Sequence, residues 1–444
     1  MLFKKKTFSG GVHPPENKNF SEHKSIELMP LPEIVIIPLQ QHIGAPSEPI
    51  VQVKDHVKIG DKLSESRGFV SVPSHASISG TVKKIEPCAH PLGVDVVSVV
   101  IESDGGGQIS DTIGDDPNYN DLSADEIKER IKNAGIAGMG GATFPTHVKL
   151  SPPPQKKIDT FILNGAECEP YLTADHQLML EQPKDILMGM NLMMKCLDCN
   201  VGYVGIENNK PDAIRLMQKT VNELGFDFQV VGFEVKYPQG AEKQLIKSCV
   251  NREVPRGGLP MDVGCLVQNV GTAKAVFEAV TKSKPLIERV VSVTGAGIKK
   301  SKNVLVPIGT RFADVIEFCG GLNDGVGKII NGGPMMGIAQ YTLDAPVIKG
   351  TSGILCLSEK ESKIPEELPC IGCARCVDAC PMGLMPNMLG TYVEYERIDE
   401  AEKAGILDCI ECGSCSYICP AKRRLVQWIK YGKLEVNRKQ KAAA

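Results

Sequence analysis

Short apolar runs separated by polar and turn residues fill the chain between residues 34 and 103. Runs of this length, rich in Val and Ile and bounded by Gly, Pro and Asp, predict short β-strands. We expect such strands at 34–38, 51–53, 78–82 and 94–101. This part of the chain is therefore predicted to be a small all-β module.

The pattern changes after a polar, Gly-rich linker at residues 103–121. Ser123 and Glu126 have the spacing of a capping box, which predicts the start of a helix. Further strand-like runs and helical patterns then alternate at 161–163, 183–197, 201–206, 210–224 and 228–235. Such alternation favours a parallel sheet covered on both faces, so we expect a Rossmann-like α/β domain.

Residues 286–345 again show short apolar runs that are typical of β-strands. Apolar runs at 290–295 and 329–333 flank one helical pattern at 311–318. A small mixed domain of β-grasp type would fit this order of elements.

The length of 444 residues and the 42% apolar content indicate several buried cores, hence a multidomain α/β protein. The net charge of −3 argues against a nucleic-acid binder. The longest apolar-rich run, 186–197, is too short to span a bilayer, and no signal peptide is recognised, so we expect a soluble cytosolic chain. Residues 421–444 carry +7, which leaves −10 for the remainder. This basic tail is predicted either to be solvated and partly disordered or to dock on an anionic partner or lipid.

Sixteen cysteines are present, and half of them form two runs with the same Cys-x2-Cys-x2-Cys-x3-Cys-Pro spacing. This spacing is typical of two 4Fe-4S clusters, in which the fourth Cys of each run ligates the other cluster. The predicted ligand sets are Cys370, Cys373, Cys376 and Cys419 for one cluster, and Cys409, Cys412, Cys415 and Cys380 for the second. Paired zinc sites or disulfides are the weaker interpretations. The residues between the runs, 386–402, are long enough for a helix, which favours an α-helical two-cluster ferredoxin domain.

A glycine-rich loop, residues 135–146, follows the capped helix and precedes Lys149. Glycines let backbone N–H groups approach a phosphate, and a nearby lysine adds positive charge. The loop is neither a Walker motif nor a Rossmann fingerprint. Its spacing alone leaves two interpretations open, a phosphate cradle or an ordinary flexible connection.

This loop, the segment Asn164-Gly165-Ala166-Glu167-Cys168-Glu169-Pro170 and the segment that begins at Tyr237 resemble the FMN- and NADH-binding flavoprotein subunit of respiratory complex I. The strand-like pattern at 290–345 also recurs in that family. Residues 57–82 resemble the lipoyl/biotinyl barrel-sandwich fold, although Ser74-His75-Ala76 stands where that family carries its modified lysine, so a scaffold role is favoured. Over residues 1–430 the chain closely resembles the C subunits of Rnf electron-transport complexes.

The resemblance implies sites but no catalytic side chain. The FMN phosphate would be held by Gly138, Gly140, Gly141 and Lys149. The flavin would be lined by Asn164, Glu167, Tyr237, Gly240, Asn269 and Thr272. The nicotinamide nucleotide would face Phe144 and Glu169. Two residues depart from the complex I pattern, because Met139 replaces an Arg and Ala241 replaces the first Glu of a pair.

With the resemblance, the chain divides into six predicted parts. They are an N-terminal segment (1–33), a barrel-sandwich domain (34–103), an FMN/NADH-binding α/β domain (121–285), an SLBB-like β-grasp domain (286–345), a two-cluster ferredoxin-like domain (360–430) and a basic tail (431–444).

The implied function is that of an NAD(H)-reactive subunit that exchanges electrons between NAD(H), FMN and two 4Fe-4S clusters. The implied partners are a ferredoxin-like B subunit, integral membrane subunits that move Na+ or H+, and ferredoxin indirectly, with the chain peripheral on the cytoplasmic face of the membrane. Two alternatives remain open: a non-catalytic iron–sulfur relay subunit, and a soluble electron-transfer subunit of an amino-acid reductase.

Overall fold

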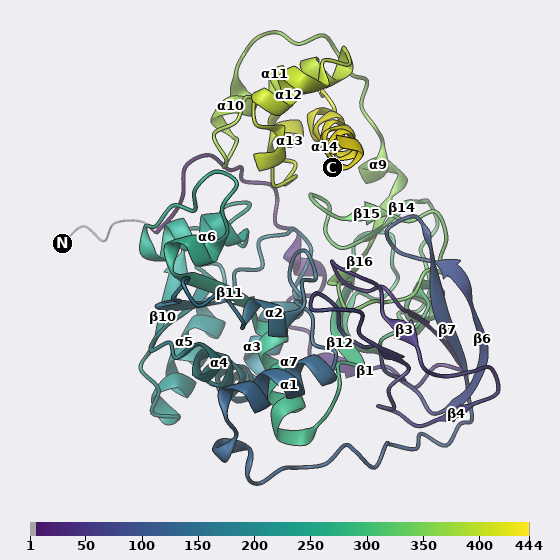
Figure 1. Cartoon of the computed structure of the whole chain (residues 1–444). Helices are drawn as coiled ribbons and strands as arrows, with labels where there is room; N and C mark the ends of the chain where they lie inside the picture. Colours follow the sequence, from purple (N-terminus) through teal and green to yellow (C-terminus); the bar gives the residue numbers. More distant parts are fainter. Residues whose placement is uncertain (1–5, 444) are drawn as a thin grey trace.

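The computed structural model describes residues 6–443, so residues 1–5 of the predicted N-terminal segment and residue 444 of the predicted tail lie outside it. Three sheets of four or more strands and a helical C-terminal part make up this chain (Figure 1). Within residues 6–443, none of the helices combines the length and the apolar character needed to cross a bilayer.

The all-β module is an antiparallel sheet in the order β2-β7-β6-β4, joined by the small pair β3-β5. Its strands are β2 (Ile34–Pro38), β3 (Glu48–Pro49), β4 (His56–Val57), β5 (Ser64–Glu65), β6 (Gly80–Ala89) and β7 (Asp95–Ser103). The strand predicted at 51–53 is wrong, because the backbone N–H of Gln52 donates to the Asp55 carboxylate at 2.7 Å and the segment forms a turn.

The predicted α/β domain contains a parallel four-stranded sheet in the order β10-β9-β8-β11. Its strands are β8 (Thr160–Gly165), β9 (Val201–Glu207), β10 (Phe228–Phe233) and β11 (Cys265–Asn269). Its helices are α1 (Ala124–Asn133), α2 (Thr146–Lys149), α3 (Ala174–Glu181), α4 (Pro183–Leu197), α5 (Pro211–Glu223), α6 (Glu242–Val250) and α7 (Val270–Lys282). The predicted capping box of Ser123 and Glu126 is confirmed at the start of α1.

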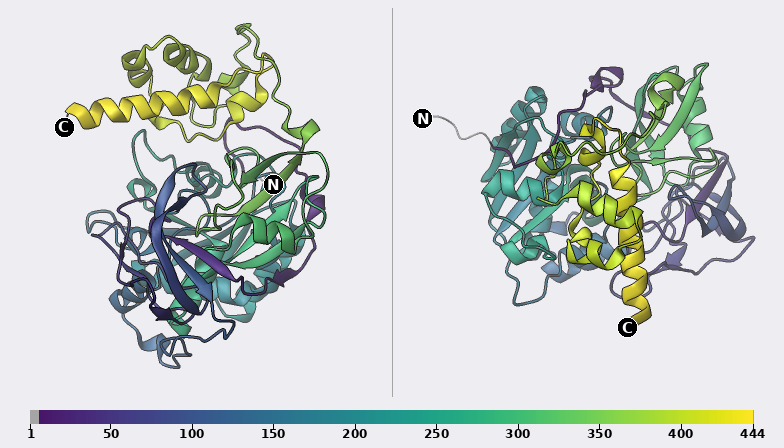
Figure 2. Two further views of the ribbon diagram at one scale, coloured as in Figure 1. Left: turned by 90° about the vertical axis from the view of Figure 1, so that its right-hand side faces the viewer. Right: turned by 90° about the horizontal axis from the view of Figure 1, so that it is seen from above.

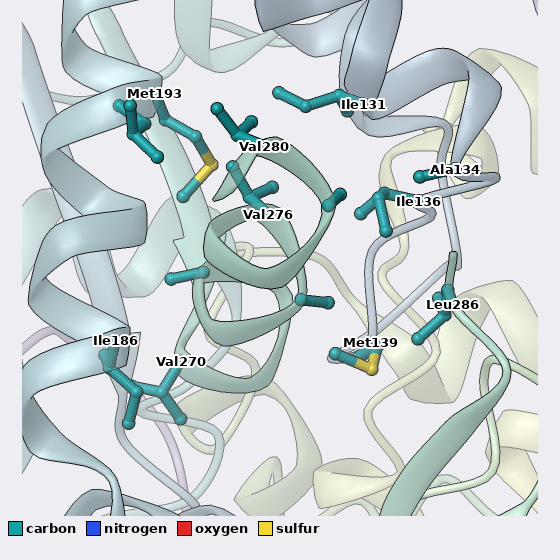
Figure 3. Packing of buried hydrophobic residues seen from close by; sticks show 14 of the residues in the cluster. Ile131, Ala134, Ile136, Met139, Ile186, Met193, Val270, Val276, Val280 and Leu286 are labelled. Carbon is teal, nitrogen blue, oxygen red and sulfur yellow. The ribbon is translucent and has the colours of Figure 1, made fainter. Parts of the chain in front are cut away.

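Both faces of this sheet are covered, as predicted. Phe161 and Leu163 point into a large core shared with α1, α4, α5 and α7, whereas Ile162 lies in a second core with α6. Figure 3 shows α7 in the large core, with Val276 and Val280 near Met193 of α4 and Ile131 of α1. Met139 of the glycine-rich loop and Leu286 pack at the edge of the same core.

The six-stranded sheet has the order β1-β13-β12-β16-β14-β15. Its strands are β1 (Ile26–Leu28), β12 (Glu288–Thr294), β13 (Lys302–Pro307), β14 (Val326–Asn331), β15 (Ile338–Ala339) and β16 (Gly353–Ser358), with α8 (Phe312–Phe318) and α9 (Glu359–Ser362) beside them. The sheet thus takes one strand from the N-terminal segment and one from beyond residue 345.

The cysteine-rich part is helical, with α10 (Arg375–Asp378), α11 (Pro386–Glu394), α12 (Ile398–Lys403), α13 (Ser414–Ile418) and the long α14 (Leu425–Ala443). The helix predicted over 386–402 is two helices, because Glu396 has a positive φ of 56° and ends the first one.

The expectation of a partly disordered tail is wrong for the described residues, although residues 437–442 are exposed to solvent as predicted. Residues 431–443 continue α14, which lies across the top of the molecule (Figure 2). The apolar face of α14 packs on α11, where Ile429 and Val436 contact Leu389 and Val393. In addition, the ammonium of Lys439 pairs with Asp399 at 2.6 Å.

Candidate functional site

The two cysteine runs fold into two separate cavities. One cavity is lined by Cys370, Cys373, Cys376 and Cys419, which we name the outer set. The other is lined by Cys380, Cys409, Cys412 and Cys415, which we name the inner set. Each cavity therefore combines three thiols of one run with the fourth thiol of the other, the grouping that the spacing predicts.

The local geometry explains this exchange. In each run a residue with positive φ, Ala374 or Gly413, turns the chain into a one-turn helix that carries the third cysteine. The fourth cysteine follows that helix, and α10 and α13 pack against each other. Each fourth thiol is thereby brought to the cavity of the other run.

Four thiols around a cavity are the donor set that a 4Fe-4S cluster needs. Among residues 6–443, no group of three Cys, His, Asp or Glu side chains is spaced to hold a single metal ion. The Cys-x2-Cys-x2-Cys-x3-Cys-Pro spacing of both runs fits a multi-iron cluster better than a tetrahedral zinc ion, whose four ligands meet at one atom.

The two sets differ in their surroundings. Cys370 and Cys373 of the outer set are exposed. Cys412 of the inner set is buried, and its backbone carbonyl accepts a hydrogen bond of 2.9 Å from the hydroxyl of Tyr237. The inner set thus lies against the α/β domain, whereas the outer set lies at the surface.

The predicted flavin residues gather at the carboxyl end of the parallel sheet, where ligands of α/β proteins bind. Asn164 is near the end of β8, and Asn269 ends β11 and caps α7 by accepting from the N–H of Gly271 at 2.8 Å. The hydroxyl of Thr272 accepts from the N–H of Met139 at 2.9 Å, which joins the glycine-rich loop to α7.

The glycine-rich loop is closed at its base by the N–H of Gly138, which donates to the carbonyl of Phe144 at 2.9 Å. Between them, the N–H groups of residues 140–143 donate to no other part of the described chain. A Cβ on Gly140 would lie 2.9 Å from the Asn269 amide nitrogen, and Gly141 has a φ of +98°. N–H groups without an acceptor in the described chain, close to Asn269 at the start of a 13-residue helix, suit the phosphate of a flavin nucleotide.

Lys149, which we expect to hold the FMN phosphate, already has partners within the protein. Its ammonium pairs with the Glu242 carboxylate at 2.6 Å and donates to the carbonyl of Val267 at 2.8 Å. Both partners belong to the α/β domain, so the charge of Lys149 is already partly balanced.

The acidic residues lie in a buried network. Glu167 accepts from the N–H groups of Asp175 and His176, at the start of α3. Asn269 donates to Asp175 at 2.6 Å. Burial, together with the nearby charge of Glu167, raises the pKa of Asp175 to about 7.

Glu169 does not project freely toward a ligand. Its carboxylate accepts from the N–H groups of Met335 and Met336 at 3.1 and 2.9 Å, and the Tyr237 hydroxyl, which donates to Cys412, lies 3.5 Å away. Burial raises the pKa of Glu169 to about 7. Glu169 therefore connects the flavin segment to the loop that follows β14.

Gly240 is held against the flavin segment. Its carbonyl accepts from the Asn164 amide at 2.9 Å, and its N–H donates to the Cys168 sulfur at 3.3 Å. A Cβ on Gly240 would lie 2.4 Å from the carbonyl oxygen of Ala166, so this position requires glycine.

Two buried cations near the site were missed by sequence reasoning. Arg289 of β12 is 6% exposed, and its guanidinium donates to the carbonyl oxygens of Lys349 and Met139. It brings a positive charge to the Met139 carbonyl of the glycine-rich loop. The second cation, Lys18, is described below.

The barrel-sandwich turn at Ser74–Ala76 is buried rather than free to swing. His75 is 6% exposed, and it lies beside the fully buried ammonium of Lys349, which donates to the carbonyls of Pro73 and Gly135. This environment agrees with a scaffold role for the module.

Four family models match the chain. They are the Nuo51 FMN-binding domain at residues 131–278, the RnfC barrel sandwich hybrid domain at 6–106, the SLBB domain at 290–339 and the 4Fe-4S dicluster domain at 369–423. The predictions of a multidomain α/β chain, an FMN-binding domain and a two-cluster domain are confirmed.

Relatives match over almost the whole length. The C subunit of the proton-translocating ferredoxin:NAD+ oxidoreductase complex of Clostridium ljungdahlii is 51% identical over 431 residues, 97% of this chain and 94% of that protein. Its counterpart in the Na+-translocating complex of Acetobacterium woodii is 48% identical over 98% of each chain. The chain belongs to the family of Rnf complex C subunits. Another member of this Rnf family, from the ion-translocating oxidoreductase complex of Rhodobacter capsulatus, is 40% identical over 97% of this chain and 83% of that protein.

Solved structures share the fold of this Rnf family member at low identity. An NAD+-reducing NiFe-hydrogenase in the air-oxidised state matches with a TM-score of 0.50 and 18% identity, over 64% of this chain and 55% of that chain. The H2-reduced state gives a TM-score of 0.51 and 17% identity, over 68% and 60%. The chain thus spans little more than half of the hydrogenase chain, and the likeness concerns the fold alone.

Proposed function

We propose that this chain is the subunit of an ion-translocating ferredoxin:NAD+ oxidoreductase complex that exchanges electrons between NAD(H) and a ferredoxin-type partner subunit. FMN and two 4Fe-4S clusters would carry the electrons within the chain. Other subunits, integral to the membrane, would couple the transfer to movement of Na+ or H+. The chain would be peripheral, on the cytoplasmic face of the membrane.

One observation carries the proposal: the hydrogen bond from Tyr237 to the carbonyl of Cys412. It joins a residue of the flavin segments to the loop of the inner cysteine set. The outer set, with Cys370 and Cys373 exposed, is accessible to a protein partner. This order supports a chain of centres from the flavin to the inner and then the outer cluster.

When bound, FMN exchanges hydride with a nicotinamide and single electrons with iron–sulfur clusters. The N–H groups of residues 140–143, the start of α7 and Lys149 would hold its phosphate, while Asn164, Glu167 and Gly240 would position the ring system. Phe144 and Glu169 would contact NAD(H), and the hydrogen bonds of Glu169 fix its carboxylate at the edge of this site. The buried carboxyls of Glu169 and Asp175 are suited to hold a proton near neutral pH.

The finer fold assignments belong to the same proposal. The parallel sheet and its helices support a Rossmann-like FMN/NADH domain at 121–285. Strands β12 to β15 of the mixed sheet, with α8, support a β-grasp domain at 286–345, to which β1 and β16 add strands from outside that range. The inner and outer cysteine sets would be the ligands of the two clusters.

Cofactor analysis of the anaerobically purified chain tests the proposal against its alternatives. The proposal predicts about eight iron atoms and about one acid-extractable FMN per chain. Iron without flavin would instead favour a non-catalytic relay. Recovery of the tagged chain with an amino-acid reductase, rather than with integral membrane subunits, would favour the soluble alternative.

A further inference from the structure

The segment of residues 8–22, which we name the strap, runs between the α/β domain and the cysteine-rich domain (Figure 1, purple). The N–H of Gly11 donates to the carbonyl of Ala379 at 2.9 Å, one residue before Cys380. Val12 and Tyr237 exchange two backbone hydrogen bonds of 2.8 and 2.9 Å. The strap therefore contacts both the loop that carries Cys380 of the inner set, which we name the inner cysteine loop, and the flavin segment that begins at Tyr237.

Further along the strap, Lys18 reaches into the other flavin segment. Its ammonium donates to the carbonyl oxygens of Glu167, Glu169 and Leu172 at 2.9, 3.1 and 2.6 Å. Lys18 is 6% exposed, and all three of its N–H donors are used. A single side chain thus fixes the backbone on both sides of Glu169.

Neighbouring residues hold the strap in register with the same segment. The N–H of Tyr171 donates to the carbonyl of Glu16 at 2.7 Å, and the rings of Phe20 and Tyr171 stack at 5.8 Å. The hydroxyls of Ser21 and Thr173 lie 2.7 Å apart. Although the barrel-sandwich family model begins at residue 6, these strap contacts are all with other domains.

We propose that the strap sets the spacing between the flavin segments and the inner cysteine set, and that Lys18 is the positioning residue for residues 167–172. This inference rests on the proposed function, because it assigns the strap a role in electron transfer between FMN and the inner cluster. The side-chain hydrogen bonds of Lys18 all go to backbone carbonyls, so we assign it a positioning role and no role in the chemistry.

The charge environment explains why a lysine suits this position. Burial and the charge of Lys210 lower the pKa of Lys18, whereas Glu167 and Glu207 raise it. Three carbonyl oxygens replace the water that the ammonium loses, because buried charged groups need such partners. A shorter or apolar side chain would leave those carbonyls without their donor.

The first test is Lys18→Met, with Lys24→Met as the matched control. Lys24 lies just past the strap, is exposed, and donates only to the carbonyl of Ser301 in the six-stranded-sheet domain. Flavin and iron per chain are measured first, followed by rapid-mixing measurement of flavin and cluster reduction by NADH. We expect both cofactors to be retained, and cluster reduction by NADH in Lys18→Met to be slower than in Lys24→Met by roughly 10- to 100-fold. Equal cluster reduction in the two variants would overturn the proposal.

A second pair of variants covers the case in which Lys18→Met fails to fold. Gly10 has a φ of +79°, and a Cβ there would lie 2.8 Å from the carbonyl oxygen of Cys380. Gly93 has a φ of +81° with no atom within 4 Å of an added Cβ. Gly10→Ala and Gly93→Ala therefore carry the same backbone strain, but only the first forces the strap away from the inner cysteine loop.

We expect Gly10→Ala alone to slow cluster reduction relative to flavin reduction, and matching rates in the two variants would contradict the strap's role. Failure of the proposed function would give a different experimental result from failure of the strap proposal. A wild-type chain whose flavin is not bleached by NADH would refute that function, whatever the variants do. A working wild type matched by every variant would refute the strap alone.

Discussion

The hydroxyl of Tyr237 lies 2.9 Å from the backbone carbonyl oxygen of Cys412 and donates a hydrogen bond to it. Tyr237 follows strand β10 of the parallel sheet, and Cys412 belongs to the inner cysteine set, so this bond crosses the boundary between two domains. Burial raises the pKa of Tyr237, which keeps its hydroxyl protonated and able to donate.

We predict that Tyr237→Phe retains flavin and iron but weakens this contact. The buried carbonyl of Cys412 loses its donor, at a cost of about 1–3 kcal/mol. Cluster reduction by NADH should slow relative to flavin reduction, measured by rapid mixing. Tyr341→Phe, at an exposed tyrosine in another domain, is the control, and an identical rate in both would count against the role of this bond.

Cys373→Ser is predicted to remove one cluster only. Cys373 lines the cavity of the outer set and is exposed, so its loss should leave the inner set and the flavin site intact. Iron and sulfide should fall by about half, with flavin unchanged. Cys88→Ser is the control, since Cys88 lies on β6 away from both cavities. Unchanged iron in Cys373→Ser would remove Cys373 from the ligand set.

Lys149→Ala is predicted to weaken FMN binding by about 1.5–3 kcal/mol, the worth of a charge-assisted hydrogen bond. The loss also leaves the Glu242 carboxylate without its ammonium partner near an anionic ligand. Glu242→Gln should therefore bind FMN at least as tightly as the wild type. Flavin retained on gel filtration measures both variants, and normal retention in Lys149→Ala would take Lys149 out of the phosphate site.

The stability of the fold is predicted to fall in acid partly through His75. Burial and the charges of Lys349 and Lys62 lower the pKa of His75 to about 3, whereas an unfolded histidine titrates near 6.5. In this pH range the unfolded chain therefore binds a proton at His75 that the folded chain does not bind. The contribution of His75 to the free energy of unfolding is fully present above about pH 6.5. It is lost as the pH falls toward 3, by up to about 1.4 kcal/mol per pH unit.

The measurement is the thermal midpoint at about pH 7.5 and about pH 5, on either side of the ordinary histidine pKa. His75→Gln should show a smaller acid shift than the wild type. Burial also lowers the pKa of other histidines, so part of the shift should remain in His75→Gln; these are His42, His90 and His147. An undiminished acid shift in His75→Gln would contradict this account.

Local sequence patterns predicted much of the parallel sheet and its helices, because strands such as β8 and helices such as α4 have clear apolar periods. The helix α7 was missed because it is buried on nearly all sides and so lacks an amphipathic stripe. Strand β1 was missed because its pairing with β13 joins residues almost 280 positions apart, which no local pattern encodes. The C-terminal helix was read as a tail because its charges are obvious and its contacts with α11 are not.

The residues of the candidate site likewise fall into those that the sequence predicted and those that it did not. The cysteine spacing predicted the grouping of thiols around both cavities, since each ligand run is local. The flavin residues came from resemblance to a known family. Neither source indicated Lys18 or Arg289, because both reach the site from distant segments and donate to backbone carbonyls, which leave no trace in the sequence.

Anaerobic titration of the isolated chain with NADH tests the central claim most directly, by following flavin and cluster absorbance together with electron paramagnetic resonance of the reduced clusters. The account predicts that NADH reduces a bound flavin and that electrons then appear on both clusters. Clusters that dithionite reduces but NADH does not, in a chain that carries its flavin, would contradict it.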